Sequence, residues 1–308
     1  MTPDRRKPLP IELVTLAYTL FTSLLILLLW QRMSDPLRLL EGRAFVLVGM
    51  GLIRLIYGVR PNRYTLFLRY LFPLSLLGYW YPDTYEFCQL FPNLDHIFAA
   101  AEQSLFGCQP SLAFSHWLPQ KLWSELFHLG YFAYYPLICL TVLSPLCTHS
   151  GGFERTAFIV LTCFFFYYTI YLFVPVTGPQ YYFHAVGNDL VASGHYPQVG
   201  DYFRYHTELS PSPGPPGLFR ELVETTQASG ERPTAAFPSS HVGVSTVLLI
   251  LLWQNRRWLF ALAVPFYFFL CCATVYIQAH YLIDVFGGLV TSVIFYTVSS
   301  WLWQRFKP

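Results

Sequence analysis

The stretch Ala235–Trp253, AAFPSSHVGVSTVLLILLW, places His241 at the head of an apolar run. A basic, hydrogen-bonding ring is costly where a chain enters hydrocarbon. We therefore expect His241 to have a use there, and the sequence on either side of it decides what kind of protein carries it.

The whole chain is as apolar as this stretch. Of its 308 residues, 54% are hydrophobic and only 12% are charged, whereas soluble domains carry roughly 25% charged residues. About eight apolar runs approach the length of about 20 residues that crosses a bilayer: 11–30, 43–58, 64–81, 128–146, 155–175, 239–253, 258–277 and 281–303, of which 43–58 and 239–253 are short. Backbone polar groups in hydrocarbon must be satisfied within their own segment. The sequence thus predicts an all-α integral membrane protein with about eight transmembrane helices.

Lys and Arg residues predict how the chain is oriented. Basic residues at 5–7, in the short hairpin QNRRW (254–258) and in the terminal QRFKP (304–308) fall on one side. Because cytoplasmic loops are enriched in Lys and Arg, we expect the N-terminus inside. The two long loops, 82–127 and 176–238, then lie on the outer or lumenal face.

These two loops differ in character. The first contains LDHIFAAAEQSLFG (94–107), an amphipathic piece expected on the membrane surface. The second contains SPSPGPPG (210–217), so we expect it to be irregular over much of its length. Cys88 and Cys108 lie in the first loop; they pair if the compartment is oxidising, or remain two free thiols.

Two histidines and an aspartate carry the chemistry. His280 and Asp284 are spaced to share one face of a helix, where Asp284 can accept a hydrogen bond from one ring nitrogen and leave the other as nucleophile or base. By the predicted topology, His241 and His280 emerge at the same end of two neighbouring spans. Such a set suits phosphoryl transfer. The alternative is two interfacial histidines and an ordinary carboxylate at a helix start.

FPSSHVG (237–243) followed by HYLIDVFGG (280–288) resembles the second and third signature motifs of the type 2 phosphatidic acid phosphatase superfamily. Its members are six-helix membrane bundles that cleave lipid phosphate esters without a metal. The resemblance implies a catalytic membrane domain over residues 64–308, with two added N-terminal helices in residues 1–63, and it implies no cofactor.

Carried over by position, the resemblance implies a role for each motif residue. His280 is the nucleophile that forms a phosphohistidine, Asp284 orients it, and His241 is the general acid. Ser239 and Ser240 hold phosphate oxygens together with nearby N–H groups. Ser239 also suits a helix N-cap, which does not exclude phosphate binding at the same helix end.

The chain departs from the phosphatase pattern. Thr274 stands where those enzymes usually have an arginine, and no first signature motif precedes Pro238. TVYIQAHYLIDV (274–285) and FVPVTGPQYYF (173–183) instead resemble the inositol phosphorylceramide synthases, an inositolphosphotransferase-like branch that lacks this arginine. By that resemblance Gln180 and Tyr181 donate hydrogen bonds to a phosphate or polyol. The alternative for these aromatics is an interfacial belt.

The missing cations need a substitute. Arg232, in the loop before His241, is the first candidate, and Arg204 and Arg220 are weaker ones. Arg69 lies within an apolar run, where it is either functional or snorkels to the interface. His128 either lines the cavity or lies at the interface.

Together these features predict a lipid phosphotransferase that moves an inositol phosphate-like headgroup from a phospholipid to a lipid alcohol. A lipid phosphate phosphatase acting on phosphatidic acid or polyprenyl phosphate is the alternative, and a non-enzymatic lipid transporter is the rival from another class. The expected partners are the phospholipid donor, the alcohol acceptor and the bilayer of the cell membrane or an endomembrane, with no metal and no nucleic acid.

Overall fold

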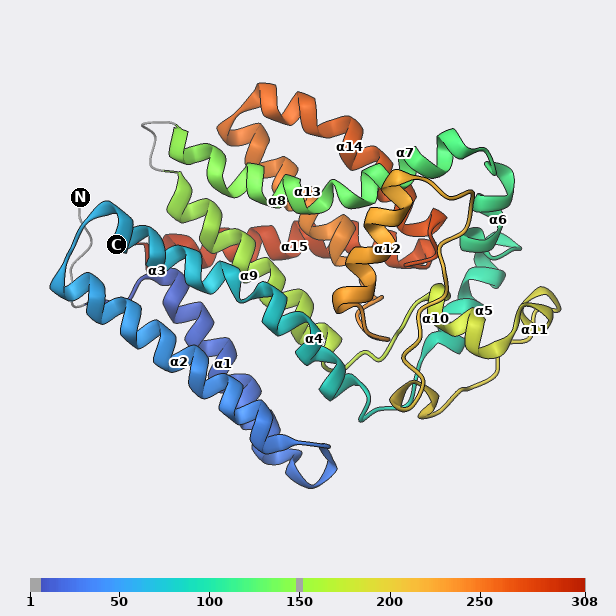
Figure 1. Cartoon of the computed structure of the whole chain (residues 1–308), viewed down its shortest axis with the longest axis horizontal. Helices are drawn as coiled ribbons and strands as arrows, with labels where there is room; N and C mark the ends of the chain where they lie inside the picture. Colours follow the sequence, from blue (N-terminus) through green and yellow to red (C-terminus); the bar gives the residue numbers. More distant parts are fainter. Residues whose placement is uncertain (1–6, 148–151, 308) are drawn as a thin grey trace.

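The computed structural model describes residues 7–147 and 152–307, and the regular structure of these residues is entirely helical. Arg5 and Arg6, used above for orientation, lie outside them. The longer helices (Figure 1) are α1 Pro10–Leu28, α2 Pro36–Val59, α3 Arg63–Ser75, α4 Leu77–Cys88, α5 Asp95–Phe106, α7 Lys121–Phe132, α8 Tyr134–Leu143, α9 Phe153–Tyr171, α12 Leu218–Gly230, α13 Ser240–Asn255, α14 Arg257–Tyr276 and α15 Leu282–Phe306. The shorter ones are α6 Pro110–Trp117, α10 Pro179–Val186, α11 Asn188–Ala192 and the 3-10 turns η1 Trp30–Arg32, η2 Ser144–Cys147 and η3 Tyr202–Arg204.

Five of these segments are long and apolar enough to cross a membrane: α1, the segment Lys121–Cys147, α9, α14 and α15. The prediction of an all-α multi-pass membrane protein is confirmed. The other three expected runs are also helical but fall short of a full apolar span. The run 64–81 is divided at Leu76 between α3 and α4, one turn after Pro73, which lacks the N–H that would continue the helix. Helix α13 has 16 residues, about 24 Å at 1.5 Å per residue, against a hydrocarbon thickness of about 30 Å.

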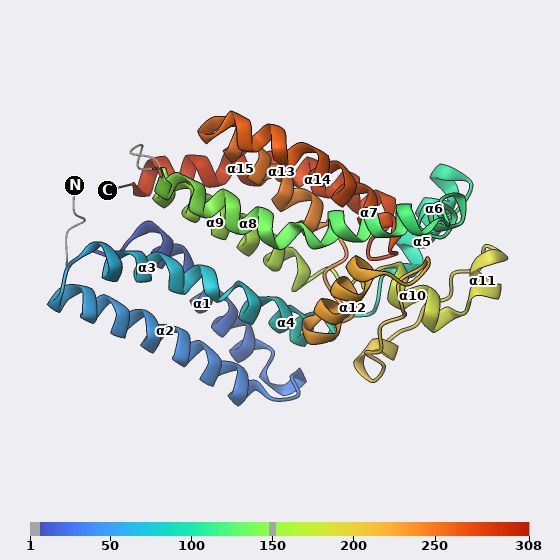
Figure 2. The same ribbon diagram turned by 45° about the horizontal axis from the view of Figure 1, so that its top comes forward.

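Helix α13 lies inside the bundle, and most of its residues are buried. It packs against α8, α9, α14 and α15, as the two views of the bundle show (Figures 1 and 2). Its start meets the start of α15 at two glycines: a Cβ on Gly288 would lie 2.5 Å from the carbonyl oxygen of Ser239, and one on Gly243 would lie 2.9 Å from the carbonyl oxygen of Gly288. This close approach brings the FPSSHVG and HYLIDVFGG motifs together.

The helices of the two long loops gather at the end of the molecule away from both termini (Figure 1). Helices α5 and α6 come from the first loop, and α10, α11 and α12 come from the second. The loops therefore share one end, as expected. Which face of the membrane this end occupies stays a prediction.

The structure bears on several expectations about the loops and the spans. The acidic residues of α5, Asp95 and Glu102, are both fully buried, and the placement of this helix on the membrane surface stays a prediction. The loop 176–238 is irregular over more than half of its length, including the SPSPGPPG stretch, as expected, and the helices α10, α11 and α12 interrupt it. His128 is also buried, and its Nδ1 contacts the carbonyl oxygen of Ser124, 2.7 Å away. Cys88 and Cys108 do not pair; both are free thiols, and Cys88 is buried.

Two buried ion pairs tie residues 7–63 to the rest of the bundle. Arg43 of α2 makes a two-pronged pair with Asp83 of α4, at 2.9 and 2.6 Å. Arg69 of α3 pairs with Glu12 of α1 at 2.6 Å, so Arg69 does not snorkel. Both pairs cross the expected domain boundary at residue 63, which itself stays a prediction.

The Arg43–Asp83 pair gives a test of the fold. Arg43→Met leaves Asp83 buried without a partner, and such a loss costs about 3–5 kcal/mol of unfolding free energy. We expect a clear drop in the thermal unfolding temperature of the purified protein in detergent. Arg38→Met, at an exposed position on the same helix, should leave it unchanged, and adding Asp83→Leu to Arg43→Met should restore part of the loss. Equal unfolding temperatures for Arg43→Met and Arg38→Met would contradict this role.

Candidate active site

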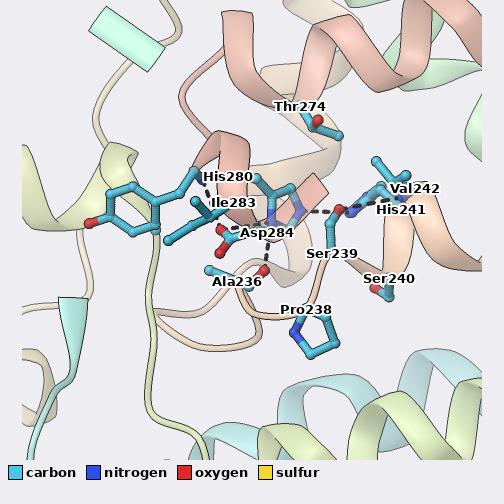
Figure 3. A network of polar contacts seen from close by, with 12 residues as sticks. Ala236, Pro238, Ser239, Ser240, His241, Val242, Thr274, His280, Ile283 and Asp284 are labelled. Atoms are coloured by element: carbon cyan, nitrogen blue, oxygen red, sulfur yellow. Dashed lines mark hydrogen bonds and ion pairs between the residues drawn. The ribbon is translucent and has the colours of Figure 1, made fainter. Parts of the chain in front are cut away.

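His241 and His280 face one another across the contact between α13 and the turn that precedes α15 (Figure 3). His241 is the second residue of α13, and His280 lies between α14 and α15. The distance from His241 Nδ1 to His280 Nε2 is 3.5 Å. This is long for a hydrogen bond between nitrogens, so the two rings are neighbours without being firmly tied.

The His280 ring is held by a backbone carbonyl. Its Nδ1 lies 2.8 Å from the carbonyl oxygen of Ala236 and 3.6 Å from Asp284 Oδ2. A carbonyl only accepts, so Nδ1 carries the proton and Nε2 keeps a free lone pair. The expectation that Asp284 is the direct hydrogen-bond acceptor thus needs correction, because Ala236 is the nearer one. Asp284 instead accepts a hydrogen bond from the Tyr281 backbone N–H at 2.8 Å, and its orienting role stays a prediction.

The backbone on both sides of this contact is strained. Ala235 has φ 67° and Gln278 has φ 66°, a left-handed conformation that costs residues with a Cβ roughly 1–2 kcal/mol. Ala235 precedes the carbonyl that binds His280, and Gln278 begins the turn that presents it. Strain of this kind gathers at functional sites.

Two buried carboxylates of α5 support the turn that carries His280. Asp95 accepts hydrogen bonds from the Thr177 and Gly178 N–H groups and from the Tyr281 hydroxyl, and its burial raises its pKa. Glu102 accepts from the N–H of Ile283 at the start of α15, and burial raises its pKa to about 7. Sequence reasoning missed both, although two acidic residues two turns apart on one helix face were a usable signal.

Aromatic rings enclose His241. The Tyr131 and Tyr134 rings stand 4.6 and 4.5 Å from its ring centre. The Tyr171 hydroxyl donates to the Pro238 carbonyl and accepts from the Ser240 N–H, which holds the start of α13. These tyrosines were also missed, because they come from α7, α8 and α9 and only the tertiary fold brings them to the site.

Two cavities meet at the histidines. One is a narrow chamber of about 20 Å³ beside His280, whose mixed lining is more polar than that of the other cavity and includes Thr177, Gln180 and Tyr181. The other is larger, about 480 Å³, and mostly apolar, with Ile138, Phe164 and Tyr168 among its lining residues. The residues that line both cavities are Tyr81, Glu231, Ser240 and His241. The reactive rings thus stand between a polar and an apolar space.

Only some of the predicted phosphate-binding residues line these cavities. Ser240 lines both cavities, and Gln180 and Tyr181 line the chamber. The Tyr181 hydroxyl is buried and has no hydrogen-bond partner among the described residues. Ser239 is the N-cap of α13, accepting from the Val242 N–H, and lines neither cavity. Arg232 is exposed and also lines neither.

The lining of both cavities lacks a cation: within residues 7–147 and 152–307, no Lys or Arg takes part in it. Arg220 pairs with Glu224. The Thr274 hydroxyl donates to the Cys271 carbonyl of its own helix. A carboxylate, Glu231, takes the place beside the site that the sequence suggested for Arg232.

About two thirds of the chain matches the model of a known protein family. The PAP2 superfamily model matches residues 96–298, a range that contains both histidines and Asp284. The chain therefore belongs to the PAP2 superfamily, whose members are phosphatases and phosphotransferases, so an enzyme acting on lipid phosphate is supported. Comparisons with curated proteins and with solved structures find no match. The inositolphosphotransferase branch stays a prediction.

The buried His280 ring gives a prediction for pH. Burial lowers the pKa of His280 to about 4, although the Ala236 carbonyl and Glu231 act in the opposite direction; the ordinary value is about 6.5. Between these pH values the unfolded chain binds a proton that the folded one does not. Stability therefore falls as the pH falls from about 6.5 to 4, by at most about 1.4 kcal/mol per pH unit from this residue.

His280→Gln removes this titration. We expect the unfolding temperature of the wild type to fall more than that of His280→Gln as the pH falls from 7 to 4.5. Thermal unfolding in detergent across this range measures it. Parallel curves for the two proteins would show that His280 titrates normally.

Proposed function

We propose that the protein is a lipid phosphotransferase that moves a phosphorylated headgroup from a phospholipid to a lipid alcohol, through a phosphohistidine at His280. The observation that carries this proposal is the pair of histidines placed where a polar chamber meets an apolar cavity. A phospholipid has the same division at its phosphate, with a polar headgroup on one side and acyl chains on the other. The chamber holds about one water molecule as it stands, so it widens to admit a headgroup.

In the first step the lone pair on His280 Nε2 attacks the phosphorus atom. The bond from phosphorus to the diacylglycerol oxygen breaks, and that oxygen takes a proton from His241. Attack requires the phosphorus to lie about 3–3.5 Å from Nε2, where His241 now stands. The His241 ring therefore moves aside when the lipid enters, and the anionic phosphate beside it favours its protonated form.

In the second step the oxygen of a lipid alcohol attacks the phosphorus. The bond between phosphorus and Nε2 breaks, and the proton of the alcohol returns to His241, which restores both rings. The N-terminal end of α13 at Ser240 favours the negative phosphate. The unpartnered Tyr181 hydroxyl and the Gln180 amide supply further donors from the chamber.

The charge of the site favours a diester substrate over a monoester. A phosphate diester carries one negative charge, whereas a monoester carries nearly two at neutral pH. Of the described residues that line the two cavities, none is Lys or Arg, which suits the diester. The scheme also uses no metal, and within the described residues no group of three or more His, Cys, Asp or Glu is placed to hold one. An inositol-like headgroup and a site on the outer or lumenal face remain parts of the proposal.

The test is headgroup transfer by the purified protein in mixed micelles. The donor is phosphatidylinositol labelled in its headgroup, and the acceptor is ceramide. We expect labelled headgroup on ceramide, and a loss of at least about 1000-fold in His280→Ala, as for a removed nucleophile. His195→Ala, at an exposed position, is the matched control and should keep full activity.

Other outcomes have distinct meanings. Label found only in water-soluble products would make the protein a hydrolase. Transfer that persists in His280→Ala would contradict the phosphohistidine. Silence of the wild type on this donor and on phosphatidic acid would contradict the substrate class.

A further inference from the structure

Glu231 places a carboxylate where the two cavities meet. It follows the last residue of α12, and its backbone N–H donates to the Gln227 carbonyl at 2.8 Å. Its side chain lines both the chamber and the apolar cavity, as do His241 and Ser240. Its neighbour Arg232 is exposed instead, so the chain turns the acidic residue, and not the basic one, toward the site.

This carboxylate is held in place with one oxygen free. The Tyr81 hydroxyl of α4 donates a hydrogen bond to Glu231 Oε1. Within residues 7–147 and 152–307, Oε2 accepts no hydrogen bond. Burial raises the pKa of Glu231, while the proximity of His280 acts in the opposite direction. The residue is half-buried, and Oε2 is not among the fully buried oxygens that lack a partner, so a molecule that fills the cavities can reach it.

The position of Oε2 defines which groups of a bound substrate it can bind. A carboxylate repels phosphate oxygens and accepts hydrogen bonds from hydroxyl groups. In the reaction proposed above, hydroxyl groups occur on the incoming lipid alcohol and on a polyol headgroup. An alcohol that enters from the apolar cavity reaches Glu231 and His241 together, because both residues line that cavity.

We propose that Glu231, oriented by Tyr81, accepts a hydrogen bond from a substrate hydroxyl, and so selects hydroxyl-bearing neutral groups over phosphate monoesters. This rests on the proposed phosphotransferase function. In the second step the hydrogen bond aims the hydroxyl oxygen at the phosphorus. The proton still passes to His241 as the new P–O bond forms and the P–N bond breaks, so Glu231 is a binding group and keeps its own protonation state.

Glu231→Gln tests this with the least change of shape. The glutamine oxygen can still accept from Tyr81, but its NH₂ then faces the substrate hydroxyl. We expect the rate of transfer to ceramide, relative to acceptor-independent release of diacylglycerol, to fall about 10–100-fold, the range for an unmet hydrogen bond. The KM for ceramide should rise, and inhibition by phosphatidic acid should strengthen because a negative charge is gone.

Two variants calibrate the effect. Glu221→Gln makes the same change at an exposed position of α12 and should behave as wild type. Tyr81→Phe leaves Glu231 in place without its orienting partner, and we expect a smaller loss in the same direction. Thermal unfolding of each variant shows whether it is folded.

A change of donor identifies which hydroxyl is bound. Phosphatidylinositol has a polyol headgroup, and phosphatidylmethanol has none. A Glu231→Gln defect confined to ceramide transfer with both donors assigns the acceptor hydroxyl; a defect in diacylglycerol release with phosphatidylinositol alone assigns the headgroup. Both results support hydroxyl binding.

Two results would overturn it. The first is that wild type and Glu231→Gln have the same transfer rate, the same KM for ceramide and the same inhibition by phosphatidic acid. The other is an equal loss of diacylglycerol release with both donors. In either case an active wild type leaves the proposed function standing, whereas a wild type inactive on both donors would refute that function itself.

Discussion

The hydrogen bond between His280 Nδ1 and the Ala236 carbonyl, 2.8 Å long, is the interaction on which the site depends. It joins the turn between α14 and α15 to the loop that leads into α13, and it fixes which nitrogen of His280 is free. The backbone adopts left-handed conformations at Ala235 and Gln278 on either side of it. The Ser239 N–H donates to the Asp284 carbonyl oxygen, which makes a second link between the same two segments. Together they place the two imidazole rings side by side, with ring centres 5.6 Å apart and ring planes inclined by 63°.

The surroundings of this contact suit a reaction at a lipid phosphate. The site lies at the end of the bundle where the loop helices gather, with an apolar cavity on one side and a polar chamber on the other. Asp95 and Glu102 support it from α5, through Tyr281 and the start of α15. Farther away, the Arg43–Asp83 and Arg69–Glu12 pairs fix α1 and α2 against α3 and α4, one of which carries Tyr81 to the site.

The sequence was informative where the determinants are local. Apolar runs predicted helices because a bilayer leaves the backbone no other choice, and His280 and Asp284 were found because they lie one helical turn apart. His280, however, lies in the turn before α15, so the expected shared helix face is wrong even though the two residues are neighbours. The sequence failed where orientation depends on packing between distant segments. Whether Glu231 or Arg232 faces the cavity depends on how the chain leaves α12, and no local pattern shows that Arg69 meets Glu12. The Ala236 carbonyl could not be foreseen either, since every residue has one and only the fold of the loop directs it at His280.

The central claim is that His280 carries the phosphorylated headgroup during turnover. The most direct measurement is to mix the purified protein with phosphatidylinositol without acceptor, quench it in alkaline denaturant, and locate the modified residue by mass spectrometry of its peptides. The account predicts an acid-labile inositol phosphate adduct on His280, which disappears when ceramide is added before the quench. An adduct on another residue, or steady turnover with His280 never modified, would contradict it.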